Sequence, residues 1–429
     1  MKEKGYVYTL IIIMFVLILL SLISYYFVLS QPVISEAIAK MRTDELYYFA
    51  ESVKMDYDRS LSVACQRSLV YVIDNSIKTR ETYKDYEMHN CTRLHYQTNG
   101  SQAAATELML CGTLHGIPVQ PPDFMENHTL LKWSERIADQ GLEQNMLVDA
   151  EIGSIEIIPY DPWTIYVVSK LDLSVYDTSN ATFYRGYDIP VVSKIELDTM
   201  EDPLYAVETG NPDLIRYFTP CNTTTPDNST AVAAWIDSQC YRMSEHAPSF
   251  FDRLDGRVNK SEYYTEQSQK LGKIGITPQS LGLESLVDVD TFAAYNASAW
   301  YNLSWIDFNY WKKTPAYCSF TNADSHKRFK IDGEHAVEYN MKNLNCSVLF
   351  TTSFTPDTLR VPVNTTITWI NSLKAESCNL IVDASGWTAK DVLPEEQAYW
   401  TFNETGTYHP ACLLSPSAAF FTSTIEITP

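Results

Sequence analysis

Few residues in this sequence have the types and spacing that an enzyme site requires. Asp252, Arg253 and Asp255 lie beside Phe250 and Phe251, and a charged cluster next to aromatic residues predicts a buried structural ion pair rather than a catalytic group. No G-x-S-x-G elbow, G-x-G-x-x-G turn or phosphate-binding loop occurs. We therefore expect no catalytic or cofactor-binding residues, and the protein is predicted not to be an enzyme.

Metal-binding patterns are also missing from the sequence. The eight His residues show no His-Glu-x-x-His or comparable spacing. Asp288 and Asp290 begin a segment similar to a calcium loop, but the Gly and the terminal Glu of such a loop are absent. We expect no metal site and no cofactor.

The nine cysteines are better explained as disulfides. No C-x-x-C occurs, which argues against zinc ribbons, thioredoxin motifs and attached c-type haem. Disulfides form in oxidising compartments, although sequence alone does not fix which cysteines pair. Cys65 is left over, to pair elsewhere or between chains. The local pairs are Cys91 with Cys111, Cys221 with Cys240, Cys318 with Cys346, and Cys378 with Cys412.

Glycosylation acceptors indicate the same compartment. Twelve Asn-x-Ser/Thr sequons, none with Pro in the middle, are spread over the chain, as in a heavily N-glycosylated ectodomain. They are Asn90, Asn99, Asn127, Asn180, Asn222, Asn228, Asn259, Asn296, Asn302, Asn345, Asn364 and Asn403.

Length and charge limit the partners. A chain of 429 residues is long enough to form two or three domains, each with its own hydrophobic core. Lys and Arg total 32 against 53 Asp and Glu, a formal net charge of −21. This charge argues against nucleic acid and anionic lipid as partners, so that only an apolar anchor should touch a membrane.

The stretch Tyr6–Leu29 predicts such an anchor. Its 24 residues carry no charge, and as a helix they would extend roughly 36 Å, enough to cross a hydrocarbon core of about 30 Å. Lys2 and Lys4 precede it, so residues 1–5 are expected in the cytoplasm and the bulk of the chain outside the cell membrane.

This segment has two alternative interpretations. A cleaved signal peptide usually has a shorter apolar core and a small-residue cleavage site, and no such site follows before Ser30. A class III, pilin-type signal would keep the helix, and Lys4-Gly5 before Tyr6 is similar to its cleavage site. Leu10 stands where many pilins carry a Glu. We expect a permanent single-pass anchor, with pilin-type processing as the alternative.

Residues 32–78 are predicted to form an amphipathic helical stalk, nearly continuous with the anchor. One face of this helix is apolar, and charged residues such as Lys54 and Asp58 occupy the other faces. The simplest interpretation is a helix packed on its own ectodomain. Apolar residues recur every four positions at Phe49, Val53, Tyr57, Leu61, Cys65 and Leu69.

Residues 79–340 are expected to form an extracellular α+β region. Lys84–Pro122 is predicted to be a polar loop region closed by a disulfide, and Thr129–Val148 a helix. A long antiparallel hairpin with one buried face should follow, because apolar residues then occupy alternate positions. They are Trp163, Ile165, Val167, Leu171, Leu173 and Val175, and then Ile189, Val191, Ile195 and Leu197.

Roughly residues 1–340 resemble large archaeal membrane-anchored surface proteins whose N-termini look like class III pilins. The segments that carry this resemblance are EDPLYAVETG at Glu201, SFFDRLDG at Ser249, LESLVD at Leu283 and WIDFNYW at Trp305. The resemblance implies a location and an architecture, but no chemistry.

Residues 347–429 resemble the cupredoxin family of Greek-key β-sandwiches. The resemblance rests on Phe354-Thr355-Pro356, the run from Asn364 to Asn371, Cys378-Asn379-Leu380-Ile381-Val382, the run from Gly406 to Cys412, and Thr424-Ile425-Glu426-Ile427. Asn364 should adopt the left-handed conformation that Gly often supplies at a turn.

The family's copper ligands are not matched here. Its first His aligns with Cys378, its Cys with Cys412, and Leu413–Phe421 offers neither the second His nor the Met. The resemblance therefore implies a disulfide in place of copper, with His409 on the opposite face. The chain as a whole is predicted to be an archaeal-type glycosylated surface protein of α+β class.

Its expected role is structural or adhesive, through other surface proteins, glycans or self-association. A pilus-like subunit, and cupredoxin-type electron transfer or copper handling, are the alternatives.

Overall fold

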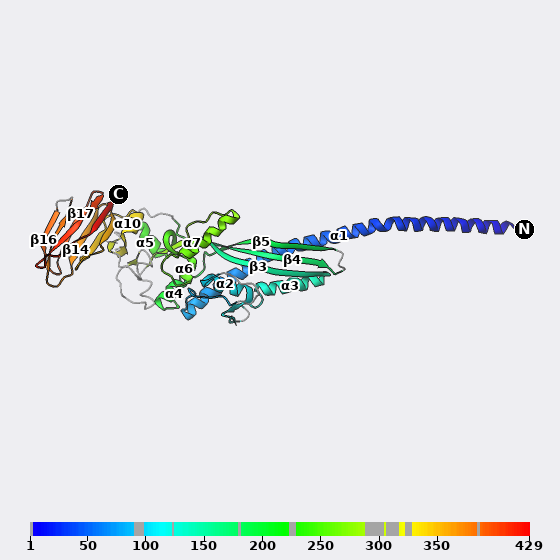
Figure 1. Ribbon diagram of the computed structural model, residues 1–429, viewed down its shortest axis with the longest axis horizontal. Helices are drawn as coiled ribbons and strands as arrows, with labels where there is room; N and C mark the ends of the chain where they lie inside the picture. The colour runs from blue at the N-terminus through cyan, green and yellow to red at the C-terminus, as the bar shows by residue number, and fades with distance from the viewer. Residues whose placement is uncertain are drawn as a thin grey trace.

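The computed structural model describes residues 3–89, 98–121, 124–178, 182–222, 229–287, 304–305, 317–321, 328–383 and 387–429. The molecule is elongated (Figure 1). The N-terminal helix projects from one end and a β-rich lobe forms the other. Between them lies a lobe of helices and strands, and the class is α+β, as predicted.

Helix α1 (Glu3–Thr79) runs through both the predicted anchor and the predicted stalk. Its segment Tyr6–Val28 has a mean hydropathy of 2.8, is exposed, and is long and apolar enough to cross a membrane. From Leu46 onward one face of α1 is buried, which confirms the predicted amphipathic pattern. The buried residues are Leu46, Ala50, Val53, Tyr57, Leu61, Ala64, Cys65, Leu69, Val72, Ile73 and Ile77.

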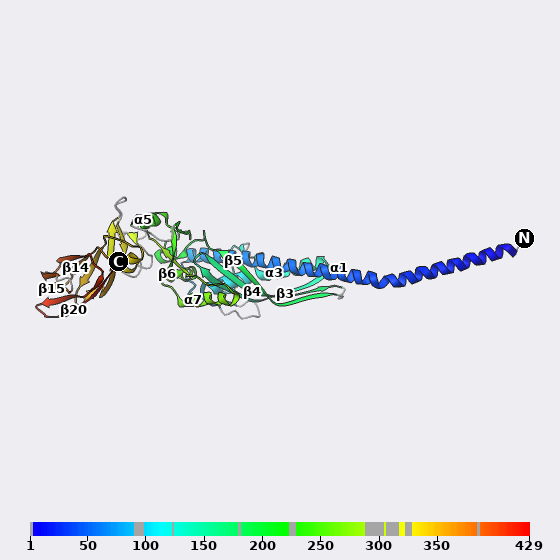
Figure 2. The same ribbon diagram turned by 90° about the horizontal axis from the view of Figure 1, so that it is seen from above.

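This face of α1 packs on an antiparallel sheet in the order β3 (Met146–Asp161), β4 (Thr164–Asp177), β5 (Phe183–Glu196). Figures 1 and 2 both show the helix lying along the sheet. Tyr57 Oη and Ser169 Oγ are hydrogen-bonded at 2.6 Å in the buried layer between them. The predicted hairpin corresponds to β4 and β5 and is confirmed.

The predicted helix Thr129–Val148 is wrong in its last turn. Helix α3 (Leu130–Glu143) ends earlier, and Met146 already begins β3. Asn145 has a φ of 58°, which turns the chain back at once. A Cβ on Gly141 would lie 2.3 Å from Val148 Cγ2, so the end of the helix packs tightly on the new strand.

The predicted loop Lys84–Pro122 is wrong over its central part. Helix α2 (Gly100–Cys111) occupies it, and every residue from Gly100 to Leu110 is buried. A helix that is enclosed on all sides has no amphipathic pattern in its sequence. The small side chains of Ala103–Ala105 allow neighbouring elements to pack closely on it. The short strands β1 (Thr113–Leu114) and β2 (Ile117–Pro118) follow.

A group of short elements continues the first lobe toward the second. Strand β6 pairs antiparallel with β7, and Arg242 stands opposite Glu284 in this ladder. The elements are α4 (Pro203–Thr209), α5 (Ser229–Ser238), β6 (Tyr241–Ser249), α6 (Phe250–Leu254), α7 (Glu262–Gln269), the 3₁₀ helix η2 (Lys270–Ile274) and β7 (Gly282–Ser285).

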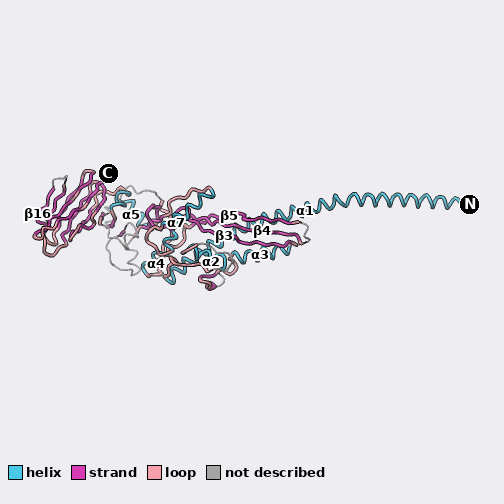
Figure 3. Tube along the Cα trace, in the orientation of Figure 1, coloured by secondary structure: helices cyan, strands magenta, loops and turns pink. Residues whose placement is uncertain are grey.

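Strands dominate the second lobe (Figure 3). One sheet has the order β17 (Gln397–Phe402), β14 (Thr365–Asn371), β11 (Asn345–Phe350), β9 (Cys318–Thr321), β10 (Arg328–Ile331), β8 (Ser304–Trp305), with β12 (Phe354–Thr355) paired to β11. A second has the order β13 (Thr358–Pro362), β21 (Thr424–Thr428), β18 (Gly406–Tyr408). A third has the order β16 (Trp387–Val392), β15 (Ser377–Val382), β19 (Pro410–Ser415), β20 (Phe420–Thr422).

These sheets enclose a hydrophobic core separate from that of the first lobe. This second core reaches back in sequence to Val232 and Ile236 of α5. Helix α10 (Gly333–Glu338) packs on β13, where a Cβ on Gly333 would lie only 1.7 Å from the carbonyl oxygen of Arg360. Asn364 has a φ of 65°, as the sequence predicted.

Candidate functional site

A buried ion pair lies where three of the segments singled out in the sequence meet. Arg253 Nη1 is 2.7 Å from Asp202 Oδ2, and both side chains are completely buried. Tyr241 Oη donates to the same carboxylate oxygen at 2.7 Å. Arg253 Nη2 donates to the carbonyl oxygen of Leu283 at 2.6 Å and to Ser285 Oγ at 3.2 Å. The predicted structural ion pair exists, but its anion is Asp202 and not a neighbour in sequence.

The two neighbouring carboxylates serve local structure. Asp252 forms a capping box with Ser249 at the start of α6, and burial raises its pKa to about 6. Asp255 accepts from the backbone N–H of Ser101 at 2.9 Å and from Tyr264 Oη at 2.6 Å, and so ties α2 and α7 together. Burial also raises the pKa of Asp255.

A second buried guanidinium, Arg216, completes the network. Its Nη1 donates to Tyr205 Oη at 2.6 Å and to the Leu286 carbonyl oxygen at 3.0 Å. Among the described residues no carboxylate pairs with this nitrogen. The guanidinium carbon lies 4.9 Å from the ring centroids of both Tyr205 and Tyr241. Burial raises the pKa of Tyr241 well above its ordinary value. These groups are buried, and their contacts join α4, β6, α6 and β7.

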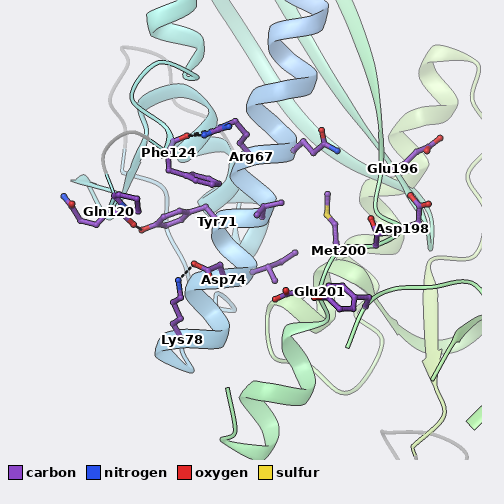
Figure 4. A pocket seen from close by; sticks show the side chains of 16 residues that line it. Arg67, Tyr71, Asp74, Lys78, Gln120, Phe124, Glu196, Asp198, Met200 and Glu201 are labelled. Atoms are coloured by element: carbon purple, nitrogen blue, oxygen red, sulfur yellow. Dashed lines mark hydrogen bonds and ion pairs between the residues drawn. The ribbon is translucent and has the colours of Figure 1, made fainter. Parts of the chain in front are cut away.

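A groove of about 590 Å³ opens beside the C-terminal part of α1 (Figure 4). Its volume is in the range of small-molecule sites, but several of its polar groups are already paired. Arg67 Nε donates to the Phe124 carbonyl at 2.9 Å, and Lys78 lies 2.6 Å from Asp74. The groove is therefore lined in part by polar groups that already have partners. Three further carboxylates line it: Glu196, Asp198 and Glu201.

One group of side chains among the described residues has the composition of a metal site. Potential ligand atoms of Glu284, His335 and Glu338 all lie within 4.8 Å of one another. No two-His motif marks this group in the sequence, so it was not among the predicted sites. The sequence signal for this group is His335-Ala336-Val337-Glu338, because residues three positions apart lie on the same face of a helix and can bind one ion together.

The charge state of His335 is set by its two carboxylate neighbours. Burial favours the neutral imidazole, but the charge of Glu284 and the contact with Asp332 outweigh it and raise the pKa of His335 well above its usual value. The same contact lowers the pKa of Asp332 despite its burial.

Three predicted cysteine pairs are brought together. The Cα–Cα distances are 5.0 Å for Cys221–Cys240, 3.9 Å for Cys318–Cys346 and 5.7 Å for Cys378–Cys412, and each pair is disulfide-bonded. Cys111 is disulfide-bonded, while Cys91 lies outside the described residues. Cys65 is a free thiol, and complete burial raises its pKa.

Cys378 and Cys412, which the sequence aligned with two copper ligands of the cupredoxin family, are joined by a disulfide. The bond joins β15 to β19 in the core, with both cysteines fully buried. With the two sulfurs bonded to each other, neither is available as a thiolate ligand. His409 is exposed, and its backbone N–H donates to Asp383 Oδ1 at 2.7 Å.

Every sequon asparagine that the structure describes is exposed. These are Asn99, Asn127, Asn222, Asn259, Asn345, Asn364 and Asn403. Outside the described residues lie Asn90, Asn180, Asn228, Asn296 and Asn302, and also Asp288 and Asp290 of the rejected calcium loop.

Comparison with known proteins finds likeness in solved structures alone. No family model matches the chain, and no curated protein matches it. A purple cupredoxin from Nitrosopumilus maritimus is similar at 18% identity and a TM-score of 0.17, over 19% of this chain and 98% of that one. A variant of amicyanin is similar at 27% identity and a TM-score of 0.17, over 20% of this chain and 82% of that one. A pseudoazurin from Sinorhizobium is similar at 18% identity and a TM-score of 0.17, over 20% and 74%.

Proposed function

We propose that this protein is a single-pass membrane-anchored surface protein whose glycosylated ectodomain has a structural or adhesive role outside the cell. The observation that carries the proposal is the continuity of α1. One helix is exposed and apolar over Tyr6–Val28 and then enters the core of the first lobe at Leu46.

This continuity gives the ectodomain a fixed position relative to the membrane. Val28 and Leu46 are 18 positions apart in one helix, which separates them by about 27 Å at about 1.5 Å per residue. A helix that is part of the folded core cannot swivel as a flexible linker does. The protein is therefore suited to presenting its second lobe far from the membrane.

Two further observations support an extracellular position. Three disulfides in the described residues suit an oxidising compartment. The seven described sequon asparagines are exposed, as glycosylation requires.

The second lobe in this proposal is a cupredoxin-like Greek-key sandwich that contributes stability rather than electron transfer. The Cys378–Cys412 disulfide supports this, because type 1 copper needs a thiolate held with two imidazoles. Adding Cu(II) to the purified protein should give no intense blue absorption. Such a band, or a free Cys412 in the native protein, would restore the electron-transfer alternative.

Protease treatment of intact cells tests the topology. We expect digestion of the chain beyond Ser30 without permeabilisation, and recovery of the anchor with the membrane fraction after carbonate extraction. Protection of the bulk of the chain would refute an external ectodomain.

Cross-linking tests the role. A membrane-impermeant amine-reactive cross-linker applied to the same cells should join this protein to other surface proteins or to its own copies. If the ectodomain is accessible to protease but forms no cross-links, the structural role fails while the topology stands.

A further inference from the structure

The group Glu284, His335 and Glu338 joins two parts of the chain that are far apart in sequence. Glu284 lies on β7, whereas His335 and Glu338 lie on α10. Leu283, beside Glu284, belongs to the first core, and Ala336, beside His335, belongs to the second. The group therefore lies where the two lobes meet.

Glu284 is the residue that ordinary packing does not explain. It is 0% exposed, and within the described part of the chain neither of its carboxylate oxygens has a hydrogen-bond partner. Its Oε2 lies 3.5 Å from His335 Nε2, an ion-pair distance. A buried carboxylate without hydrogen bonds has lost its hydration and gained no replacement, which costs free energy of folding. A cation in direct contact with the carboxylate would offset this desolvation cost.

His335 is oriented toward Glu284 by its own helix. Asp332, the N-cap of α10, accepts from the backbone N–H of Glu334 at 2.9 Å and of His335 at 3.0 Å. Its other oxygen contacts His335 Nδ1. A carboxylate on one ring nitrogen fixes the imidazole and directs the other nitrogen to a metal, which is the usual outer partner of a ligating His.

The charges around the group leave a place for a divalent cation. Arg242 Nη2 lies 2.6 Å from Glu338 Oε1, and Arg242 is also the cross-strand neighbour of Glu284. Three carboxylates, those of Glu284, Glu338 and Asp332, lie around His335, and the Arg242 guanidinium pairs with Glu338. Two negative charges are therefore left over once a metal ion displaces the proton of His335. A divalent ion would balance them.

We propose that Glu284, His335 and Glu338 bind a divalent transition-metal ion of the zinc class, which ties β7 of the first lobe to α10 of the second. Ligand atoms about 2.1 Å from a tetrahedral ion lie about 3.4 Å apart, and His335 Nε2 and Glu284 Oε2 are separated by 3.5 Å. An imidazole among the ligands favours zinc-class ions over calcium or magnesium, which take oxygen ligands.

The site also has a route to solvent. The side chain of Glu338 is 41% exposed, whereas those of Glu284 and His335 are buried. An ion could enter past Glu338, and with three protein ligands it would keep one position for water.

Metal binding to the full-length chain in detergent tests the proposal. After treatment with EDTA and removal of the chelator, Zn²⁺ is added by equilibrium dialysis at pH 7.5, and bound metal is measured by mass spectrometry. Co²⁺ is added to a second sample and followed by its visible absorption. We expect one ion per chain and a visible spectrum typical of four-coordinate cobalt.

The variants Glu284→Gln, His335→Gln and Glu338→Gln should each weaken Zn²⁺ binding by more than about 100-fold. Asp332→Asn should weaken it by about 10- to 100-fold, the range measured for outer partners of metal ligands. The matched controls are Glu334→Gln and His246→Gln. Both residues are exposed, and both variants should bind like the unaltered protein.

A buried ion pair without metal is the competing explanation, and the same samples separate the two. If the EDTA-treated protein takes up no Zn²⁺ or Co²⁺, or if folded Glu284→Gln binds as tightly as the unaltered chain, the proposal is wrong. Glu338 is partly exposed, so Glu338→Gln should fold normally and gives the result even if the buried variants do not fold.

Discussion

Arg253 and Asp202 form a completely buried ion pair with a nitrogen–oxygen distance of 2.7 Å, although 51 positions separate them in the chain. Removing one member of such a pair leaves an uncompensated charge in the core. We expect Arg253→Met to lower the free energy of unfolding by about 3–5 kcal/mol. Guanidinium unfolding followed by tryptophan fluorescence measures this change.

The matched control is Arg360→Met in the second lobe. Arg360 lies 3.8 Å from Glu426, and both side chains are about half exposed, so its loss should cost less than about 1 kcal/mol. Equal effects of the two substitutions would show that burial of the Asp202–Arg253 pair does not matter.

The pH dependence of stability should report on Asp252. Burial raises its pKa from 3.8 to about 6 in the folded protein. The folded state then holds the proton more tightly than the unfolded state, so the contribution of Asp252 is fully present below pH 3.8 and is lost as the pH rises through 6.

Between pH 7 and pH 5 the unaltered protein should therefore gain about 1 kcal/mol relative to Asp252→Asn. The variant keeps an acceptor oxygen for the capping box with Ser249 but does not titrate. Asp188→Asn is the control, since that side chain is 72% exposed. A constant difference between Asp252→Asn and the unaltered protein across this range would contradict the prediction.

The Cys378–Cys412 disulfide should stabilise the second lobe. The two cysteines are 34 positions apart, and closing a loop of that length is worth a few kcal/mol in the chain-entropy model. Cys378→Ser should lower the melting temperature of this lobe and leave membrane association unchanged. Non-reducing peptide mapping should show the cross-link in the unaltered protein. If the thiols of Cys378 and Cys412 both react with iodoacetamide in the native protein, the predicted disulfide is wrong.

The N-terminus separates the permanent anchor from a pilus-like subunit. We expect an uncleaved chain, or one that has lost only Met1, by mass spectrometry of the intact protein. A mature end at Tyr6 would instead indicate class III processing after Gly5 and would favour assembly into a pilus-like structure.

Local patterns in the sequence were enough to predict several elements. The charge-free run from Tyr6 and the four-residue period from Phe49 to Leu69 both report a helix, because each depends only on residues one or two turns apart. Alternating apolar residues likewise predicted the strands β4 and β5, where one face of the sheet is buried. Cysteines close in sequence paired as expected, since short loops bring them together at low entropic cost.

Tertiary structure decided the features that no local pattern encodes. Helix α2 is buried on every side, so the sequence of Gly100–Leu110 has no amphipathic period and predicts a loop. Asp202 meets Arg253, and Glu284 meets His335, only because the fold brings β7, α4, α6 and α10 together. The types of these residues were visible in the sequence, but partners about fifty residues apart are chosen by chain topology and by the penalty on an unpaired buried charge.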